Sequence, residues 1–198
     1  FFVLLGPSGS GKTTLLNLIA AIDRPDEGRI EVGGVDLTAH SSASLADWRA
    51  SHIGYVFQTA NLVPVLTAYE NVELPLWLHR MTAAERHRRV ALALEAVGLA
   101  DRASHLPKQL SGGQEQRVAV ARAVVADPEI LVADEPTGNL DHESAAGVLT
   151  LLSRLHRERG KTIVMVTHDP RAAEYGTRRY RLDKGSLSPL PPAEPAKP

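Results

Sequence analysis

The stretch from residue 6 to residue 13 restricts most strongly what this 198-residue chain can fold into. It reads Gly6-Pro7-Ser8-Gly9-Ser10-Gly11-Lys12-Thr13 and fits the pattern G-x-x-x-x-G-K-[ST] at every fixed position. An apolar run precedes it and a helical pattern starting at Thr14 follows it. Glycines let consecutive N–H groups turn inward on a phosphate, and the helix adds the positive end of its dipole. We therefore predict a phosphate-binding loop (P-loop), continued by Thr14, in which Lys12 contacts the β- and γ-phosphates and the Thr13 hydroxyl ligates Mg²⁺.

Apolar runs and helical patterns alternate along most of the chain. Runs without polar alternation are typical of strands buried on both faces of a parallel sheet, and three occur, at Phe1–Leu5, Ile130–Ala133 and Ile163–Val166. Helical patterns cover Thr14–Ile22, Ala83–Val97, Gln114–Ala126 and Ser144–Arg159. This alternation predicts an α/β fold with a mostly parallel central sheet.

Other segments depart from that alternation. Residues 28–35 alternate polar and apolar side chains before a Gly pair, which predicts a short antiparallel strand and turn. Tyr180–Leu187 predicts a second hairpin. Residues from about 60 to 126 are helical by pattern and are predicted to form an inserted helical subdomain. Five of the 13 prolines lie in the last ten residues, so residues 187–198 are predicted to form a disordered tail.

The composition excludes several classes of protein. Without cysteine the chain has no disulfide scaffold, thiolate zinc site or cysteine nucleophile. Its 22 Lys and Arg against 23 Asp and Glu give no basic excess, so we expect no nucleic-acid partner. No apolar run approaches the roughly 18 residues of a membrane span, and no charged region precedes the first apolar run, as it would in a signal peptide. We expect a soluble, cytoplasmic domain that reaches a membrane only through a partner.

Two carboxylates follow the apolar run at residues 130–133. An Asp at a strand end can reach Mg²⁺, and the next acid can orient and deprotonate an attacking water. We assign Asp134 to the metal and Glu135 to the general base. The alternative is a strand end capped by solvated acids before the turn at Pro136-Thr137-Gly138.

A second helix start suited to an anion lies at Leu110-Ser111-Gly112-Gly113-Gln114. Ser111 is a good N-cap, and the glycines expose backbone N–H groups of the first turn. The segment could be a helix cap and nothing more. If both helix starts serve one nucleotide, they converge either within the chain or across a symmetric dimer, and the residues leave both arrangements open.

In this order the motifs resemble those of the ATPase subunit of an ABC transporter, and the resemblance covers Phe1 to about Ser186. The P-loop matches the Walker A motif, Gln58 the Q-loop glutamine, Leu110–Gln114 the LSGGQ signature, Asp134-Glu135 the Walker B motif, Asn139-Leu140-Asp141 the D-loop and His168 the switch histidine. The resemblance implies a P-loop NTPase fold and a head-to-tail homodimer with two ATP molecules, each between one P-loop and the opposing signature. It also implies Mg²⁺ held by Thr13 and Gln58 with Asp134. Taken singly, Gln58 could be a polar loop residue and Asp141 a helix N-cap.

Within the family, the stretches Glu135–Asp141 and Asn71–Leu76 resemble the ATPases of macrolide-efflux and lipoprotein-release systems. That resemblance implies a transmembrane permease as partner, at the inner face of the cell membrane, and export of a drug, peptide or lipoprotein. Residues Ala60–Leu78, with Tyr69 and Trp77, would form part of the groove that receives the permease, or else subdomain core.

The family stacks adenine on an aromatic residue in a strand upstream of the P-loop. The resemblance therefore implies an N-terminally truncated chain and an incomplete antiparallel β-subdomain, to which Ile30–Val32 and Tyr180–Leu182 would belong.

Two functions remain. The first is an ATP hydrolase that powers an exporter, and the alternative is a nucleotide-gated regulatory ATPase of a membrane or cell-division complex without transport. DNA-repair ATPases with a similar signature split the two halves of the site with a long coiled coil. Lys12 and Asp134 lie 122 residues apart without sustained heptads between them, which excludes that class.

Overall fold

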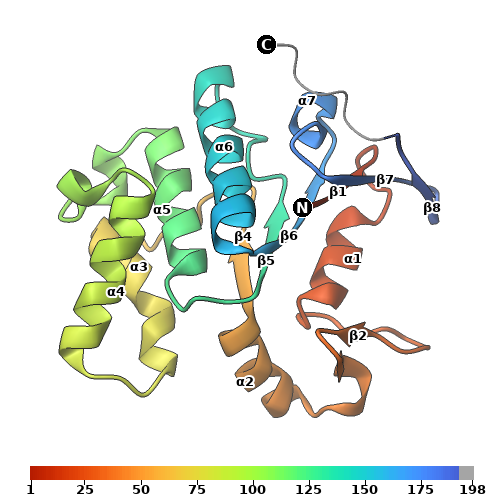
Figure 1. Cartoon of the computed structure of the whole chain (residues 1–198), viewed down its shortest axis with the longest axis horizontal. Helices are drawn as coiled ribbons and strands as arrows, with labels where there is room; N and C mark the ends of the chain where they lie inside the picture. Colours follow the sequence, from red (N-terminus) through yellow and green to blue (C-terminus); the bar gives the residue numbers. More distant parts are fainter. Residues whose placement is uncertain (192–198) are drawn as a thin grey trace.

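A six-stranded sheet forms the centre of the molecule in the computed structural model, which describes residues 1–191 (Figure 1). The strand order is β4-β5-β6-β1-β7-β8. All neighbours pair in parallel except β8, which is antiparallel to β7. The strands are β1 (Phe2–Leu5), β4 (Ile53–Val56), β5 (Ile130–Asp134), β6 (Thr162–Thr167), β7 (Arg178–Asp183) and β8 (Ser186–Pro189). A separate antiparallel sheet consists of β2 (Glu31–Val32) and β3 (Val35–Asp36).

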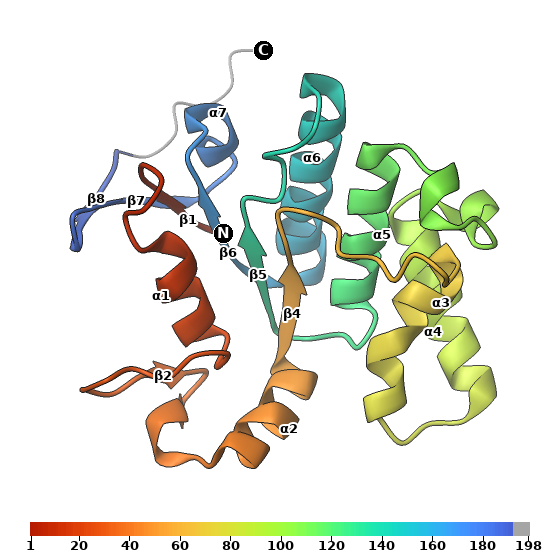
Figure 2. The same ribbon diagram turned by 180° about the vertical axis from the view of Figure 1, so that it is seen from behind.

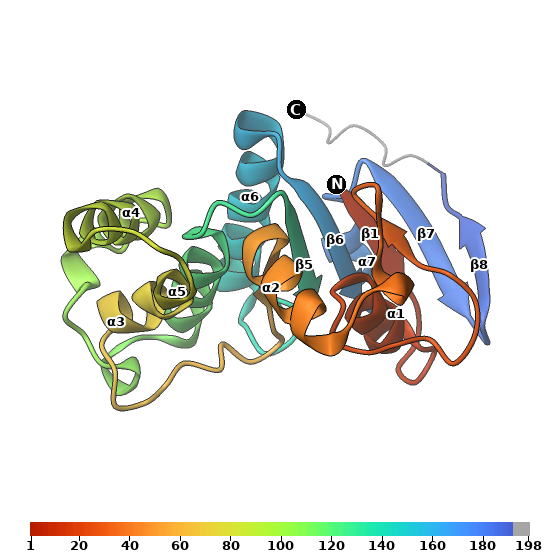
Figure 3. The same cartoon turned by 90° about the horizontal axis from the view of Figure 1, so that it is seen from below.

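Helices cover the sheet and fill the connection between β4 and β5, where every described element is helical (Figure 3). The α-helices are α1 (Lys12–Ile19), α2 (Ser42–His52), α3 (Ala68–Glu73), α4 (Ala83–Ala96), α5 (Gly112–Val124), α6 (His142–Arg159) and α7 (Pro170–Ala173). The 3₁₀ helices are η1 (Leu37–Ala39), η2 (Leu74–Leu78), η3 (Ala100–Arg102) and η4 (Pro107–Gln109). Within residues 1–191, none of these helices has the length and apolar character needed to cross a membrane. The predicted α/β fold with a mostly parallel sheet is confirmed.

The two faces of the sheet are buried against different helices. Successive side chains of a strand point to opposite faces, and in β5 the fully buried Leu131 and Val132 belong to two different core clusters. Leu131 packs in the cluster that contains α5, α6 and α7, whereas Val132 packs in the cluster that contains α1. Figures 1 and 2 show α1 on one side of the sheet and α5 and α6 on the other. Burial on both faces explains why these strands are uninterrupted apolar runs.

Two expectations require correction. Tyr180–Leu182 lies in β7 and pairs in parallel with β1, so it belongs to the main sheet and not with Ile30–Val32. The predicted tail began at residue 187, but residues 187–189 continue β8, which pairs with β7. Residues 192–198, the rest of that tail, lie outside the described residues. The sequence also gave no expectation of β4 or α2, and the helical subdomain at about 60–126 stays a prediction.

Gly54 explains why β4 is hard to recognise. Glycine disfavours a strand because it adds backbone entropy and no packing. Here a Cβ at residue 54 would lie 2.1 Å from the carbonyl oxygen of Ala123 and 2.6 Å from Leu131 Cδ2. Helix α5 therefore packs so closely on β4 that only glycine fits.

We predict that Gly54→Ala lowers the free energy of unfolding by about 1–3 kcal/mol, because either α5 or β4 must move to admit the methyl group. Urea denaturation followed by circular dichroism measures this change. Gly147→Ala in α6 is the matched control. Its added Cβ meets only the end of the flexible Arg117 side chain, at 2.7 Å, and alanine favours a helix. Equal loss of stability in both variants would contradict the explanation.

Candidate functional site

The carboxyl ends of three adjacent strands bring the predicted site residues together. Strands β5, β6 and β1 are neighbours, with Leu5 opposite Thr167 and Asp134 opposite Val166. The loops that leave these strands therefore start side by side. Open parallel sheets bind ligands at this edge.

The P-loop connects β1 to α1 and has the backbone geometry of an anion cradle. Gly9 and Gly11 have φ of 78° and 93°, values that glycine adopts without strain. Gly11 is the N-cap of α1 and provides no side-chain cap, so the first N–H groups of α1 are left to an external acceptor. Gly6 fits beneath β7, because a Cβ there would lie 2.3 Å from the carbonyl oxygen of Leu182. The buried Ser10 hydroxyl has no hydrogen-bond partner within residues 1–191.

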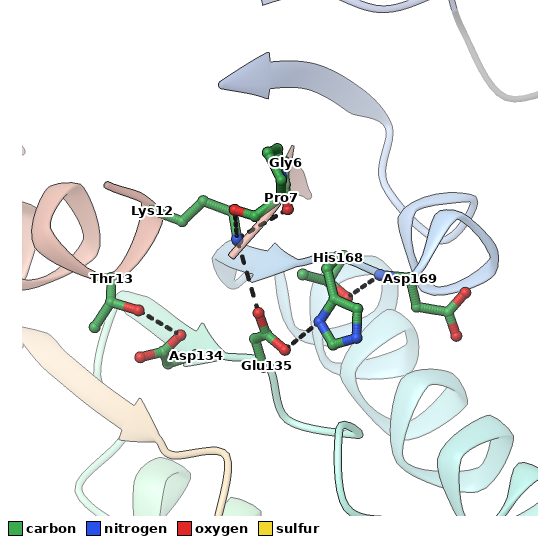
Figure 4. A network of polar contacts seen from close by, with 9 residues as sticks. Gly6, Pro7, Lys12, Thr13, Asp134, Glu135, His168 and Asp169 are labelled. Atoms are coloured by element: carbon green, nitrogen blue, oxygen red, sulfur yellow. Dashed lines mark hydrogen bonds and ion pairs between the residues drawn. The ribbon is translucent and has the colours of Figure 1, made fainter. Parts of the chain in front are cut away.

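Lys12 lies across the loop and is only 5% exposed. Its Nζ donates to the carbonyl oxygens of Gly6 and Pro7, both at 2.9 Å, and lies 3.8 Å from Glu135 Oε1 (Figure 4). The ammonium is thus held over the cradle by neutral carbonyls and one carboxylate. This position suits it to meet a phosphate oxygen.

Thr13 and Asp134 face each other across the site. The Thr13 hydroxyl donates to Asp134 Oδ1 at 3.2 Å (Figure 4). Burial raises the pKa of Asp134 above its ordinary value, the negative charge of Glu135 adds to the increase, and the Thr13 hydrogen bond and Lys12 oppose it. The surroundings of Asp134 therefore disfavour its ionised form.

Glu135 connects Lys12 to His168. His168, which follows β6, places Nδ1 2.5 Å from Glu135 Oε2 (Figure 4). The backbone of Glu135 has φ of 45°, a left-handed conformation that is strained for a non-glycine residue and is frequent at functional sites. The Glu135 N–H donates to the carbonyl oxygen of Val166 at 2.9 Å, which helps to hold this conformation.

Gln58 enters the site from the sheet edge. It lies two residues beyond β4, is exposed, and its Nε2 lies 3.0 Å from where a Cβ of Gly138 would be. It therefore faces the loop that begins at Glu135. Gln58 and the acids come from sequence positions far apart and approach each other because β4 is paired with β5.

The segment at 110–114 begins α5, which packs on the face of the sheet opposite to α1. Ser111 Oγ accepts from Gln114 N–H and Gln114 Oε1 accepts from Ser111 N–H, a reciprocal capping box. Gly113 is close to α6, since a Cβ there would lie 2.6 Å from Ser144 Oγ. Asp141 is the N-cap of α6 and accepts from Ser144 N–H at 2.9 Å. The backbone hydrogen bond from Ser144 holds the pKa of Asp141 below its ordinary value.

The structure thus brings together one group of predicted residues and leaves the other apart. P-loop residues, Gln58, Asp134, Glu135 and His168 meet at the carboxyl edge of the sheet. Helix α1 and helix α5 pack on opposite faces of that sheet. Within residues 1–191 no hydrogen bond or ion pair joins the P-loop to residues 110–114. This separation favours the arrangement in which the helix starts of two copies converge across a symmetric dimer.

The donors around Asp134 fit a magnesium ion that a phosphate shares. Mg²⁺ takes oxygen ligands and commonly uses one or two protein groups, with phosphate and water completing the shell. Thr13 and Asp134 supply a hydroxyl and a carboxylate 3.2 Å apart, and Gln58 leaves the neighbouring strand at the same edge of the sheet. Among the described residues no group of three or more His, Asp or Glu side chains is arranged for a metal. The donor set therefore suits a metal that arrives with its nucleotide.

Tyr55 is a residue beside the site that the sequence did not single out. Its hydroxyl donates to Asn17 Oδ1 of α1 at 3.0 Å. Burial, then the charges of Asp134 and Asp23, raise the pKa of Tyr55 to about 12. It ties β4 to the P-loop helix. Since β4 was not predicted, no signal in the sequence pointed to it.

Comparisons with known proteins agree with this geometry. The family profile described as "ABC transporter" matches residues 1–138. An ABC transporter ATP-binding protein of Bacillus subtilis, YvrO, is 49% identical over 94% of this chain and 81% of its own length. The macrolide export ATP-binding/permease protein MacB of Marinobacter nauticus is 46% identical over 94% of this chain, which spans 29% of that protein.

A solved structure extends the likeness to three dimensions. It is the ATP-binding cassette MJ0796 of Methanocaldococcus jannaschii, described as a dimer in a post-hydrolysis state bound to ADP and Pi. It superposes with a TM-score of 0.86 at 42% identity, over 96% of this chain and 85% of that chain.

We predict that Asp134→Asn raises the melting temperature of the nucleotide-free protein at pH 7.5. A raised carboxyl pKa means that the folded state binds the proton more tightly than the unfolded state, so ionised Asp134 costs stability at neutral pH. The cost disappears as the pH falls toward the unfolded value of about 3.9. The two chains should therefore converge near pH 4 in EDTA. The exposed Asp47→Asn is the control. A less stable Asp134→Asn protein at pH 7.5 would contradict this cause.

Proposed function

The chain belongs to the ABC transporter family as one of its ATP-binding subunits, and from this membership we propose how its own residues bind and hydrolyse ATP for a membrane partner. The observation that carries the proposal is that the two anion-receptive helix starts lie on opposite faces of the sheet.

The P-loop holds the phosphates. The uncapped N–H groups at the start of α1, with those of Gly9 and Gly11, point to one anion, and Lys12 moves from the Gly6 and Pro7 carbonyls to the β- and γ-phosphates. Both carbonyl contacts are neutral, so a phosphate oxygen is the stronger partner for the ammonium. Gly6, Pro7, Ser8, Ser10 and Thr14 complete the nucleotide-binding set of this loop.

A magnesium ion held here would neutralise the charge that develops on the phosphates. Thr13 and Gln58 would hold it directly, and Asp134 would hold it through its water shell. The positive charge of the ion would stabilise the ionised form of Asp134, which burial and Glu135 both disfavour.

Glu135 acts as general base toward the attacking water. In the structure its two oxygens face Lys12 and His168. When Lys12 turns to the phosphates, one oxygen of Glu135 becomes free to accept a proton. His168 keeps the other oxygen in place through Nδ1, and as an imidazolium, which donates from both ring nitrogens, it would also donate to the γ-phosphate from Nε2.

The opposing subunit completes each site. Two copies in head-to-tail contact bring the Ser111–Gln114 helix start of one subunit to the nucleotide on the P-loop of the other. Ser111 Oγ accepts a hydrogen bond within its own helix, so its hydroxyl proton is available to a phosphate oxygen. Gly112 and Gly113 leave the adjoining N–H groups uncovered, and Asp141 lies beside them at the N-terminus of α6. The dimeric MJ0796 cassette supports this assembly.

A permease would bind beside η2. Two apolar side chains of η2, Trp77 and Leu78, are strongly exposed, at 63% and 74%, as is Val65 before α3, at 78%. Leu78 and His79 help to line a groove between α2, β4, η2 and α5. Tyr69 packs against the core instead. Exposed apolar side chains beside a groove mark an interaction surface. The name of MacB, a macrolide export ATP-binding/permease protein, supports a permease partner and export of a drug. A place at the inner face of the membrane and export of a peptide or lipoprotein instead rest on the resemblance of Glu135–Asp141 and Asn71–Leu76 to efflux and lipoprotein-release ATPases.

We predict that Glu135→Gln keeps ATP binding and lowers turnover by about 100-fold or more, because the amide cannot take a proton from water. Equilibrium binding of a fluorescent ATP analogue and release of inorganic phosphate measure the two quantities. Glu129→Gln, just before β5 at the opposite end of the strand, is the control and should hydrolyse ATP at the parental rate. Parental turnover in Glu135→Gln would show that the base is another group.

We predict that Ser111→Arg, in a Glu135→Gln background, abolishes ATP-dependent dimerisation in sedimentation experiments and leaves ATP binding to the monomer intact. The bulky side chain blocks the approach of the partner's phosphates. Arginine also removes an N-cap worth about 1 kcal/mol, so Ser111→Asp is a second variant that keeps the cap and repels phosphate. Ser104→Arg, exposed and outside the signature, is the control. Dimers that persist in both Ser111 variants would overturn the shared site.

Transport itself requires the permease. ATP-dependent uptake into inverted vesicles that contain the permease and this subunit tests export. A complex that hydrolyses ATP and moves no substrate would favour the regulatory alternative.

A further inference from the structure

Two polar side chains of α5 hold the loop that carries Gln58. Gln116 is 2% exposed, and its Nε2 donates to the carbonyl oxygen of Phe57 at 2.8 Å. Arg122 donates from Nη1 to the carbonyl oxygen of Asn61 at 2.8 Å and from Nη2 to that of Ala60 at 2.7 Å. Helix α5 thus binds the loop on both sides of residues 58 and 59. Figure 2 shows this loop leaving β4 and passing α5.

The hydrogen bonds of Gln116 and Arg122 all go to backbone carbonyls of the Gln58 loop and its flanks. A buried polar side chain is costly unless it is hydrogen-bonded, and α5 is otherwise apolar on its buried face. Burial lowers the pKa of the Arg122 guanidinium from its ordinary value, yet the group stays charged. A guanidinium that donates to two successive carbonyls fixes their relative orientation, which a single-point donor such as lysine does not. Asn61 in this loop has φ of 47°, so the backbone is also held in a strained conformation.

The Gln58 side chain itself has no hydrogen bond to the described residues and is exposed. Its reach toward Asp134 and the P-loop is therefore set by the backbone on either side of it. That backbone is held by α5, and α5 begins at the signature segment.

We propose that Arg122 and Gln116 are positioning residues for Gln58. They join the Gln58 loop to helix α5 as one body, which fixes how closely Gln58 can approach the metal and the γ-phosphate. The proposal rests on the role of Gln58 proposed above. Arg122 also lines the groove next to η2, so a permease seated there would contact the same body.

Hydrogen exchange tests the positioning without any nucleotide. Arg122→Met keeps the length of the stem and removes all donors, and we expect the amides of residues 58–62 to exchange about tenfold faster while the core strands stay protected. Gln116→Met should act in the same direction. Arg117→Met, on the same helix but packed toward Gly147, is the matched control and should leave the loop unchanged. Unchanged exchange at 58–62 in both Arg122→Met and Gln116→Met would overturn the proposal.

Magnesium dependence tests the consequence for the site. Arg122→Met should raise the Mg²⁺ concentration for half-maximal ATP hydrolysis about 10-fold, the usual effect of losing an outer-shell partner. In a Gln58→Ala background the same change should have no further effect. A further 10-fold rise in that Mg²⁺ concentration in the Gln58→Ala background would show that Arg122 does not act through Gln58 and would overturn the proposal.

Two further variants keep the result decisive. If Arg122→Met does not fold, Arg122→Lys takes its place and should give an intermediate shift, because lysine reaches one carbonyl only; an exchange pattern and Mg²⁺ curve equal to the parent would overturn the proposal. Gln58→Ala alone tests the role of Gln58. If it leaves Mg²⁺ activation at the parental value, the metal assignment of Gln58 fails, while the exchange experiment still decides whether α5 holds the loop.

Discussion

The parallel pairing of β5, β6 and β1 is the constraint on which the site depends. Parallel neighbours end at the same edge of a sheet. The loops that follow Asp134, Thr167 and Leu5 therefore begin side by side. The hydrophobic cost of exposing either face keeps these strands between two layers of helices. The strained backbone of Glu135 is held by its N–H bond to Val166 on the neighbouring strand.

Close contacts at three glycines hold the surrounding loops and helices against the sheet and against each other. Gly6 lets the P-loop rest on the carbonyl of Leu182, Gly54 lets α5 lie against β4, and Gly113 lets the start of α5 touch Ser144 of α6. At each of these places a methyl group would meet another atom at less than 3 Å. The geometry of the site therefore depends on glycine at these three positions as well as on the side chains that line it.

Much of the fold and most of the site residues could be predicted from the sequence. The strands at Phe2–Leu5, Ile130–Asp134 and Thr162–Thr167 were visible because burial on both faces leaves an uninterrupted apolar run. Strand β4 was missed because Gly54 weakens its pattern for a reason that lies in α5, almost seventy residues away. The prediction that Tyr180–Leu182 belongs to the antiparallel β-subdomain was wrong. A hairpin pattern specifies one neighbour of β7, which is β8, and says nothing about the strand on its other side, which is β1.

The chemical features of the candidate site can be predicted from short stretches of sequence: a cradle suited to phosphate at Gly6–Thr13, acids at the end of an apolar strand, a histidine after the next, and a second helix start at Ser111. Each feature depends on residue types at short spacing and on local backbone preferences. Which of these features lie together depends on the packing of the whole chain. Strand order brings Gln58, Glu135 and His168 to one edge, and the alternation of side chains across the sheet sends α1 and α5 to opposite faces. Both arrangements depend on contacts between segments that are far apart in the chain, so no short stretch of sequence specifies them.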